Sequence, residues 1–337
     1  MINKIQCFSA ININDQERKE STSGGIFSLL CKFILDKNGV VYGAAYDTNQ
    51  NVFHCKVTSE EEIHKIRGAK YAPSSLNGIY FEIEQLLNNN VWVLFSGTPC
   101  QVVSLKKYLK KDYDILVTVD LVCHGVPVQE AWRKYLEYRK DQDGQDKIAS
   151  NINMRSKVTG WSRYGYSVSF KYCSGYEYTC LGSADTYMYA FVNNMILRPV
   201  CNKCQFKGTN RQSDFTLGDF WGVWDIRPSM DDNKGTSLVL VHSNKGMLIW
   251  KNLANDIICE KITYEQACEQ NLSIIRSSAC YENRDELLRR IDKEGWGAVI
   301  DEIQIHKKKT NTVIQSPSFV NRMNNKLKRL LESFNRN

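Results

Sequence analysis

The sequence is poor in proline and histidine and has no long apolar run. Its 337 residues include 6 prolines and 5 histidines, and 42% of them are hydrophobic and 24% charged. This composition is typical of a globular chain and excludes a disordered or collagen-like one. The longest apolar runs, such as VWVLF at 91–95, are far shorter than the roughly 18 residues of a membrane-spanning helix. The N-terminal residues do not resemble a secretion signal, so we expect a cytoplasmic protein.

Common nucleotide-binding motifs and a basic protein body are also missing. The chain contains neither G-x-G-x-x-G nor G-x-x-x-x-G-K-[ST], which excludes a standard dinucleotide fingerprint and a P-loop. The net charge of +7 comes from residues 306–337, which carry eight basic residues and one acid. A nucleic-acid-binding protein would spread basic residues over its folded body. We therefore expect no nucleic-acid partner.

The basic C-terminal segment predicts an amphipathic helix at 320–335. Its apolar residues fall on one helical face, with basic residues around them. Such a helix can bind an anionic membrane surface or a partner protein. Alternatively, it packs on its own domain as an ordinary terminal helix. The apolar face consists of Met323, Leu327, Leu330, Leu331 and Phe334.

The order of apolar and polar segments predicts a mixed α/β (α+β) fold. Residues 91–111 and 115–140 each resemble a buried strand followed by a loop and a helix. Residues 40–57 and 165–180 each predict an antiparallel hairpin. No sharp linker divides the chain. We expect two closely associated α/β parts, with an antiparallel sheet portion and a C-terminal helical tail.

Cysteine is abundant, with twelve residues in the chain. In a reducing cytoplasm, grouped cysteines favour a metal, cluster or catalytic site over disulfides. Isolated cysteines more often act as small buried hydrophobic residues. We expect the buried role for eight of them, namely Cys7, Cys31, Cys55, Cys173, Cys180, Cys259, Cys268 and Cys280.

The remaining four cysteines suggest a metal site. Cys201 and Cys204 form a C-x-x-C pair, which can bind one metal from a tight turn. Cys100 and Cys123 each follow a predicted strand, and the loops after parallel strands gather at one edge of a sheet. The four thiolates can thus hold a 4Fe-4S cluster, or the C-x-x-C pair alone forms a small zinc or redox site. His124, next to Cys123, is a candidate proton donor.

Two segments have features suited to phosphate. The turn at Ser23, Gly24 and Gly25 precedes a predicted helix, whose N-terminus offers free N–H groups and a positive dipole end. Arg67 and Lys70 can add positive charge to a pyrophosphate site. The aromatic ring of Tyr71 can lie against a ligand ring.

Seven segments occur in a distinctive order over roughly residues 20–245, and together they resemble one family. They are STSGGIF, RGAKYA, FSGTPCQV, VDLVCHGVP, NMRSKVTGW, LRPVCNKC and SDFTLGDFWGV. This set resembles the coenzyme F420 hydrogenase/dehydrogenase beta-subunit family. The resemblance implies an N-terminal-type domain at 1–98, a C-terminal-type domain at 99–305 and a basic amphipathic tail at 306–337.

The resemblance also implies FAD beside a 4Fe-4S cluster. It favours a cluster bound by Cys100, Cys123, Cys201 and Cys204. The residues implied to bind FAD are Ser23, Gly24, Gly25, Arg67, Lys70, Tyr71, Gly97, Thr98 and Gln101. His124 and Lys157 are the expected catalytic residues. Further pocket residues are expected in the other shared segments, namely Trp161, Asp214, Asp219 and Trp221.

Many bacterial relatives begin with a ferredoxin-like domain, whereas this chain has only Cys7 before the STSGG turn. We therefore expect electrons to come from a separate ferredoxin or another donor protein. They would pass through the cluster and FAD to a small two-electron acceptor, coenzyme F420 or another organic molecule. The alternative is a non-catalytic binding or assembly protein in which Cys201 and Cys204 hold zinc.

Overall fold

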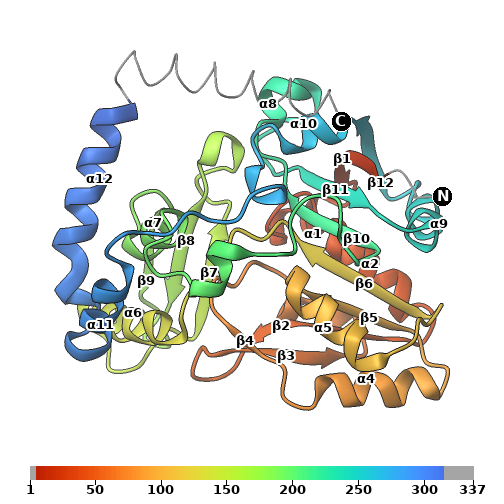
Figure 1. Ribbon diagram of the computed structural model, residues 1–337, viewed down its shortest axis with the longest axis horizontal. Helices are drawn as coiled ribbons and strands as arrows, with labels where there is room; N and C mark the ends of the chain where they lie inside the picture. Colours follow the sequence, from red (N-terminus) through yellow and green to blue (C-terminus); the bar gives the residue numbers. More distant parts are fainter. Residues whose placement is uncertain (1–4, 315–337) are drawn as a thin grey trace.

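The computed structural model describes residues 5–314, with a nine-stranded sheet at its centre (Figure 1). Along the chain its strands are β1 (Gln6–Asn12), β2 (Val40–Tyr46), β3 (Val52–Val57), β4 (Ser74–Ser75), β5 (Val93–Gly97), β6 (Leu116–Leu121), β10 (Phe215–Asp219), β11 (Ser237–Val241) and β12 (Ile257–Ile262). In space they run in the order β12-β1-β11-β10-β6-β5-β2-β3-β4. Strands from both ends of the described chain thus share one sheet.

The middle of this sheet is parallel. β10 pairs with β6, β6 with β5 and β5 with β2, all in parallel, whereas β12, β1 and β11 add an antiparallel edge. Gly97, at the end of β5, lies opposite Asp120 near the end of β6. The loops that follow these two strands therefore leave the sheet side by side at its carboxyl edge.

Helices cover both faces of the large sheet. They include α1 (Asp15–Glu20), α2 (Ile26–Leu35), α3 (Ile63–Ile66), α4 (Ile79–Asn88), α5 (Pro99–Leu109), α8 (Val223–Ile226), α9 (Asn244–Asn252) and α10 (Tyr264–Cys268). In β5, Leu94 packs in the apolar cluster of α2 and α9, while Val93 and Phe95 pack in that of α4 and α5. This alternation follows from the two-residue period of a strand.

A second, three-stranded sheet lies beside the first (Figure 1). Its strands are β7 (Asn151–Ser156), β8 (Ser167–Lys171) and β9 (Glu177–Leu181), paired antiparallel in the order β7-β8-β9. Its helices are α6 (Gln129–Gln142), α7 (Thr186–Val192), α11 (Arg284–Glu294) and α12 (Ile300–Ile314). Trp132, Tyr135, Tyr187 and Trp296 are fully buried and supply large rings to this core.

The predicted mixed α/β fold with an antiparallel portion is confirmed. The hairpins expected at 40–57 and 165–180 are β2–β3 and β8–β9. The strands β1, β4, β7, β10 and β12 are not predicted from the sequence. The predicted boundary at 98/99 falls between β5 and α5, within the large sheet. The division into two domains at this boundary stays a prediction. The predicted helix at 320–335 lies outside the described residues.

The prediction that eight isolated cysteines are buried is only partly correct. Cys7, Cys31 and Cys268 are buried. Cys55 and Cys180 are intermediate in exposure, and the remaining three, Cys173, Cys259 and Cys280, are exposed. Their exposure has a local cause, because Cys259 lies on the edge strand β12 and the other two lie in loops.

None of the helices in the described part of the chain is both long and apolar enough to cross a membrane.

The turn at Ser23–Gly25 packs tightly between α1 and the large sheet. The Gly24 N–H donates to Ser237 Oγ at 2.9 Å, and its carbonyl accepts from the Asn12 N–H at 2.7 Å. Ser23 Oγ donates to the Thr236 carbonyl at 2.7 Å. Gly25 has a φ of 86°, a left-handed conformation that favours glycine, and α2 begins after it.

Gly24→Ala tests this packing. An added Cβ would lie 2.3 Å from the Ala10 carbonyl oxygen and 2.7 Å from the Ser237 nitrogen, and neither backbone atom can move without disturbing a strand. We expect the free energy of unfolding in urea to fall by about 3 kcal/mol. Gly297→Ala is the control, because the nearest atom to its added Cβ is 4.0 Å away. Equal losses in the two variants would contradict the described packing.

Candidate functional site

Two adjoining hollows are lined by residues from both sheets. The first has a volume of about 710 Å³ and the second about 1120 Å³. Ala69, Lys70 and Arg155 line both of them. Ligand sites are commonly concave and of this general size. The two hollows can therefore accommodate one extended ligand or two neighbouring ones.

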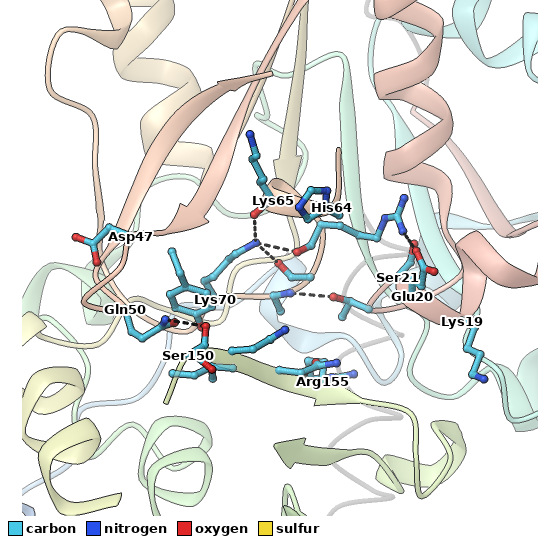
Figure 2. A pocket seen from close by; sticks show the side chains of 18 of the residues that line it. Lys19, Glu20, Ser21, Asp47, Gln50, His64, Lys65, Lys70, Ser150 and Arg155 are labelled. Carbon is cyan, nitrogen blue, oxygen red and sulfur yellow. Dashed lines mark hydrogen bonds and ion pairs between the residues drawn. The ribbon is translucent and has the colours of Figure 1, made fainter. Parts of the chain in front are cut away.

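The first hollow is basic. Its cations are Lys19, Lys65, Arg67, Lys70 and Arg155, against the two acids Glu20 and Asp47. Figure 2 shows Lys70 and Arg155 among its lining residues, from the loop after α3 and from β7.

Lys70 is the most constrained of these cations. Its Nζ donates to the carbonyls of Arg67 at 2.8 Å, Gly68 at 3.2 Å and Lys65 at 3.3 Å (Figure 2). Burial lowers the pKa of Lys70 to about 7. An anionic ligand would favour its charged form.

Several buried polar atoms in the two linings have no hydrogen-bond partner among the described residues. In the first hollow they are Tyr46 Oη, Gln50 Oε1 and Arg67 Nε. Arg155 Nε borders both hollows, and Asn271 Oδ1 belongs to the second. Unpaired buried polar groups are costly, so they indicate sites where a ligand or water completes the bonding.

The second hollow is aromatic and holds a buried ion pair. Its rings include Tyr71, Tyr164, Tyr166, Phe191 and Trp221.

Arg155 joins the two sheets at the aromatic side of the second hollow, which we call its wall. Its Nη2 donates to Asp219 Oδ2 at 2.6 Å, and its guanidinium carbon lies 3.8 Å from the centre of the Tyr166 ring and 4.7 Å from that of Trp221. Such cation–aromatic contacts are strongest where water is excluded. The wall is therefore suited to a flat ring system with polar edges.

Of the four cysteines expected to bind a cluster, Cys123 lines the second hollow, and the other three, Cys100, Cys201 and Cys204, interact with it electrostatically. Burial raises the pKa of Cys123 to about 12; Lys207 opposes this rise, and the thiols of Cys100, Cys201 and Cys204 add to it. Cys201 also interacts electrostatically with Cys100 and Cys204. The Val126 N–H donates to Cys201 Sγ at 3.4 Å, a contact of the kind that stabilises sulfur ligands.

Among the described residues, no group of three or more histidine, cysteine, aspartate or glutamate side chains is close enough to hold a single metal ion. A zinc site needs its ligands about 2 Å from one common centre. In a 4Fe-4S cluster each thiolate binds its own iron atom, so the ligands are spread more widely.

Comparison with known proteins identifies the family. The family model for the C terminus of the beta subunit of coenzyme F420 hydrogenase/dehydrogenase matches residues 91–267, more than half of the chain. The chain belongs to this family. The predicted resemblance is confirmed, and membership indicates an oxidoreductase of the F420 hydrogenase/dehydrogenase kind.

A solved structure supports the fold of this family member. The chain is similar to a chain in the xenon-derivatised F420-reducing [NiFe] hydrogenase complex from Methanosarcina barkeri, with 16% sequence identity and a TM-score of 0.51. The similarity covers 93% of this chain and 92% of the other. No curated protein matches the sequence.

The segments expected to bind FAD differ in their position. Arg67, Lys70, Tyr71 and Thr98 line one or both hollows. Ser23, Gly24 and Gly25 are in neither lining, and the Gly24 N–H already bonds to Ser237. The expectation that this turn offers free N–H groups is therefore wrong for Gly24.

Gly97 and Gln101 also lie outside the two linings. Gln101 Oε1 accepts from the Thr98 N–H at 2.9 Å and completes a capping box at the start of α5. This cap fixes the direction in which the helix carrying Cys100 leaves the sheet. Cys100 itself is exposed, and its Sγ lies 3.0 Å from Thr98 Oγ1.

The two expected catalytic residues have different surroundings. His124 lines the second hollow, where burial lowers its pKa against the opposing effect of Asn194. Lys157 lies outside both linings, and its Nζ donates to the carbonyls of Arg18 and Ser23, the latter at 2.6 Å. This placement supports a structural role for Lys157, and its catalytic role stays a prediction.

The other expected pocket residues lie in different parts of the structure. Asp219 and Trp221 line the second hollow, and Trp161 stacks on Trp221 from the buried side. Asp214 lies elsewhere: its Oδ2 accepts from the Thr118 N–H at 2.9 Å, and its Oδ1 accepts from Ser243 Oγ. It therefore ties β6 to the start of α9.

Sequence reasoning misses Arg155. This residue belongs to the NMRSKVTGW segment, in which the sequence points only to Lys157 and Trp161. Arg155 is 5% exposed and borders both hollows. Its position in that segment is the one feature of the sequence that could have indicated a role for Arg155. Its partner Asp219 is 64 residues away, so the ion pair becomes apparent only in the folded structure.

The pKa of Lys70 makes anion binding in the first hollow pH-dependent. We expect the affinity for ADP-ribose, whose pyrophosphate charge is constant in this range, to fall about tenfold between pH 7 and pH 9 as Lys70 loses its proton. Calorimetric titration on the complete protein measures this change. Lys70→Arg keeps its charge and should bind equally well at both pH values. The same pH dependence in Lys70→Arg would show that another group titrates.

Proposed function

We propose that this protein is an oxidoreductase that uses FAD and a 4Fe-4S cluster. Electrons from a ferredoxin-like donor would pass one at a time to the cluster, then to FAD, and then as a pair to a small acceptor, coenzyme F420 or another organic molecule. The cytoplasm is the proposed location. The observation that carries the proposal is the position of Cys123, which borders the aromatic hollow and lies within electrostatic reach of three other thiols.

The cysteine arrangement suits a cluster. Lys207 lies close enough to Cys123, Cys201 and Cys204 to interact with them electrostatically, and its positive charge opposes the rise in the pKa of Cys123. We propose Cys100, Cys123, Cys201 and Cys204 as the ligands of the cluster. The alternative, a zinc-binding assembly protein that uses Cys201 and Cys204, is separated from it by the metal content measured below.

The two hollows suit the two ends of FAD. The basic first hollow would hold the pyrophosphate, with Arg67 and Lys70 as its main cations. The aromatic second hollow would hold the flavin ring between the first hollow and Cys123. The unpaired Arg155 Nε, at the junction, would donate to an acceptor atom of the ligand. These residues would fix the ligand's orientation.

When bound, the cluster would carry single electrons and FAD would pair them for a two-electron acceptor. The protein's own residues would hold the two groups in fixed positions. Arg155 and Asp219 hold the wall of the second hollow, and the Lys207 ammonium, bonded to the Cys123 and Ser273 carbonyls, holds the cysteine loop. His124 lies next to Cys123, and we propose it as a proton donor.

The surface around the C-x-x-C pair suits an acidic donor protein. Arg198, Lys203 and Arg276 are exposed and near the cysteine loops. None of the three forms an ion pair with a carboxylate among the described residues. Unpaired surface cations attract a partner of opposite charge and speed its association.

Cys123→Ser tests the cluster. The anaerobically purified wild-type protein should be brown, with about four iron atoms and four sulfides per chain. Loss of one thiolate ligand should remove most of the iron. Cys173→Ser is the matched control, because Cys173 is an exposed cysteine in the loop between β8 and β9. A colourless wild-type protein with one zinc per chain would favour the assembly-protein alternative instead.

Arg67→Ala tests the flavin site separately. Removing this guanidinium takes one cation from the first hollow without touching a cysteine. We expect FAD content to fall severalfold while iron content stays unchanged, as measured by flavin absorbance and iron analysis. Arg133→Ala is the control, because Arg67 pairs with Glu20 and Arg133 likewise pairs with glutamates, but Arg133 lies on the exposed face of α6. Unaltered flavin content in Arg67→Ala would contradict this location.

A further inference from the structure

Three aromatic rings form a stack at the wall of the second hollow. Trp161 and Trp221 have ring centres 5.0 Å apart and planes 12° from parallel. Trp221 and Tyr164 have centres 4.4 Å apart and planes 28° from parallel. No ring contact joins Trp161 to Tyr164, both within the described residues, which indicates that they lie on opposite faces of Trp221.

The inner end of this stack is firmly held. Trp161 is fully buried, and its indole N–H donates to Asp219 Oδ1 at 3.3 Å. Its backbone N–H donates to Asn233 Oδ1 at 2.8 Å. Asp219 in turn accepts from Arg155, so the inner ring belongs to the same bonded group as the wall of the hollow. Trp221 therefore stacks on a ring that is itself held in place by hydrogen bonds.

The outer ring is held much less firmly. Tyr164 is 48% exposed, and no hydrogen bond to its hydroxyl occurs among the described residues. Its contacts are with the Trp221 ring and with the edge of Trp224.

The backbone that carries this outer ring is unusual. Arg163 has a φ of 51° and Tyr164 a φ of 65°, so two consecutive residues with side chains adopt the left-handed conformation. Residues other than glycine rarely adopt it, and such conformations are frequent at functional sites. The strained backbone therefore carries the most exposed ring of the stack.

We propose that the outer face of Trp221 is a binding site for the planar ring of the electron acceptor, and that Tyr164 covers this face until the acceptor binds. This inference rests on the proposed redox function and specifies its substrate as a molecule with a flat conjugated ring. Both Tyr164 and Trp221 line the second hollow, so a ring on Trp221 would lie in the same cavity as the proposed flavin. Stacking between aromatic rings favours an offset parallel geometry such as the Trp221–Tyr164 pair already shows.

The test uses protein that contains its full flavin and iron. 5-Deazariboflavin serves as a planar tricyclic probe, and its dissociation constant is measured by quenching of tryptophan fluorescence. Because the probe has no phosphate, the first hollow contributes little to its binding. Ferricyanide reduction by the photoreduced protein reports separately on the redox centres, since ferricyanide has no aromatic ring.

Two variants give opposite expected results. Tyr164→Ala removes the covering ring and should tighten probe binding about fivefold. Trp221→Leu removes the stacking face and should weaken it at least tenfold. Tyr176→Ala is the matched control, because Tyr176 is 46% exposed but lies outside the linings of both hollows. It should bind the probe as the wild type does.

The outcomes separate this inference from the proposed function. Absence of flavin, iron and ferricyanide reduction in the wild-type protein would overturn the proposed function. If these are present, unchanged or weaker probe binding in Tyr164→Ala would overturn the covering role. Loss of flavin in Trp221→Leu, together with unchanged probe binding in Tyr164→Ala, would assign Trp221 to FAD and overturn the proposed acceptor site.

Discussion

The buried ion pair between Arg155 and Asp219 joins the two sheets of this protein. Arg155 comes from β7 of the small sheet and Asp219 from the end of β10 in the large one, and their side chains are 5% and 12% exposed. Removing one partner of such a pair leaves an uncompensated charge, which is strongly destabilising. The shape of both hollows depends on this contact. Arg155 also stands between the basic hollow and the aromatic one, a division that matches a ligand with a charged end and a flat end, as FAD has in the proposed function.

A second buried network holds the cysteine-bearing loops. Arg211 donates to Asp120 Oδ1 at 2.8 Å and to the Leu121 carbonyl at 3.1 Å. Thr216 Oγ1 donates to the same carboxylate, linking β10 to β6. Asp120 is near the end of the strand that leads to Cys123, and Arg211 follows the C-x-x-C turn. The network thus fixes the two loops relative to each other.

Much of the fold is predictable from local patterns. The apolar run before SGTPC and the one before CHGVP correctly predict β5 and β6, and the Thr98–Gln101 spacing agrees with the capping box observed at α5. β10 is not predicted, because the glycine, aspartate and tryptophan residues of its segment conceal a short buried strand. Its partners β6 and β11 are supplied by other parts of the chain.

Local sequence patterns also predict only part of the candidate site. The sequence by itself determined the family, the four cysteines and the basic RGAKY segment, because ordered motifs and residue chemistry are local properties. Only the tertiary structure decided that Arg155 borders both hollows, that Lys157 bonds to backbone carbonyls and that Tyr164 stacks on Trp221. The physical reason is that burial, charge pairing and ring stacking depend on residues far apart in the chain, which meet only when the two sheets pack together.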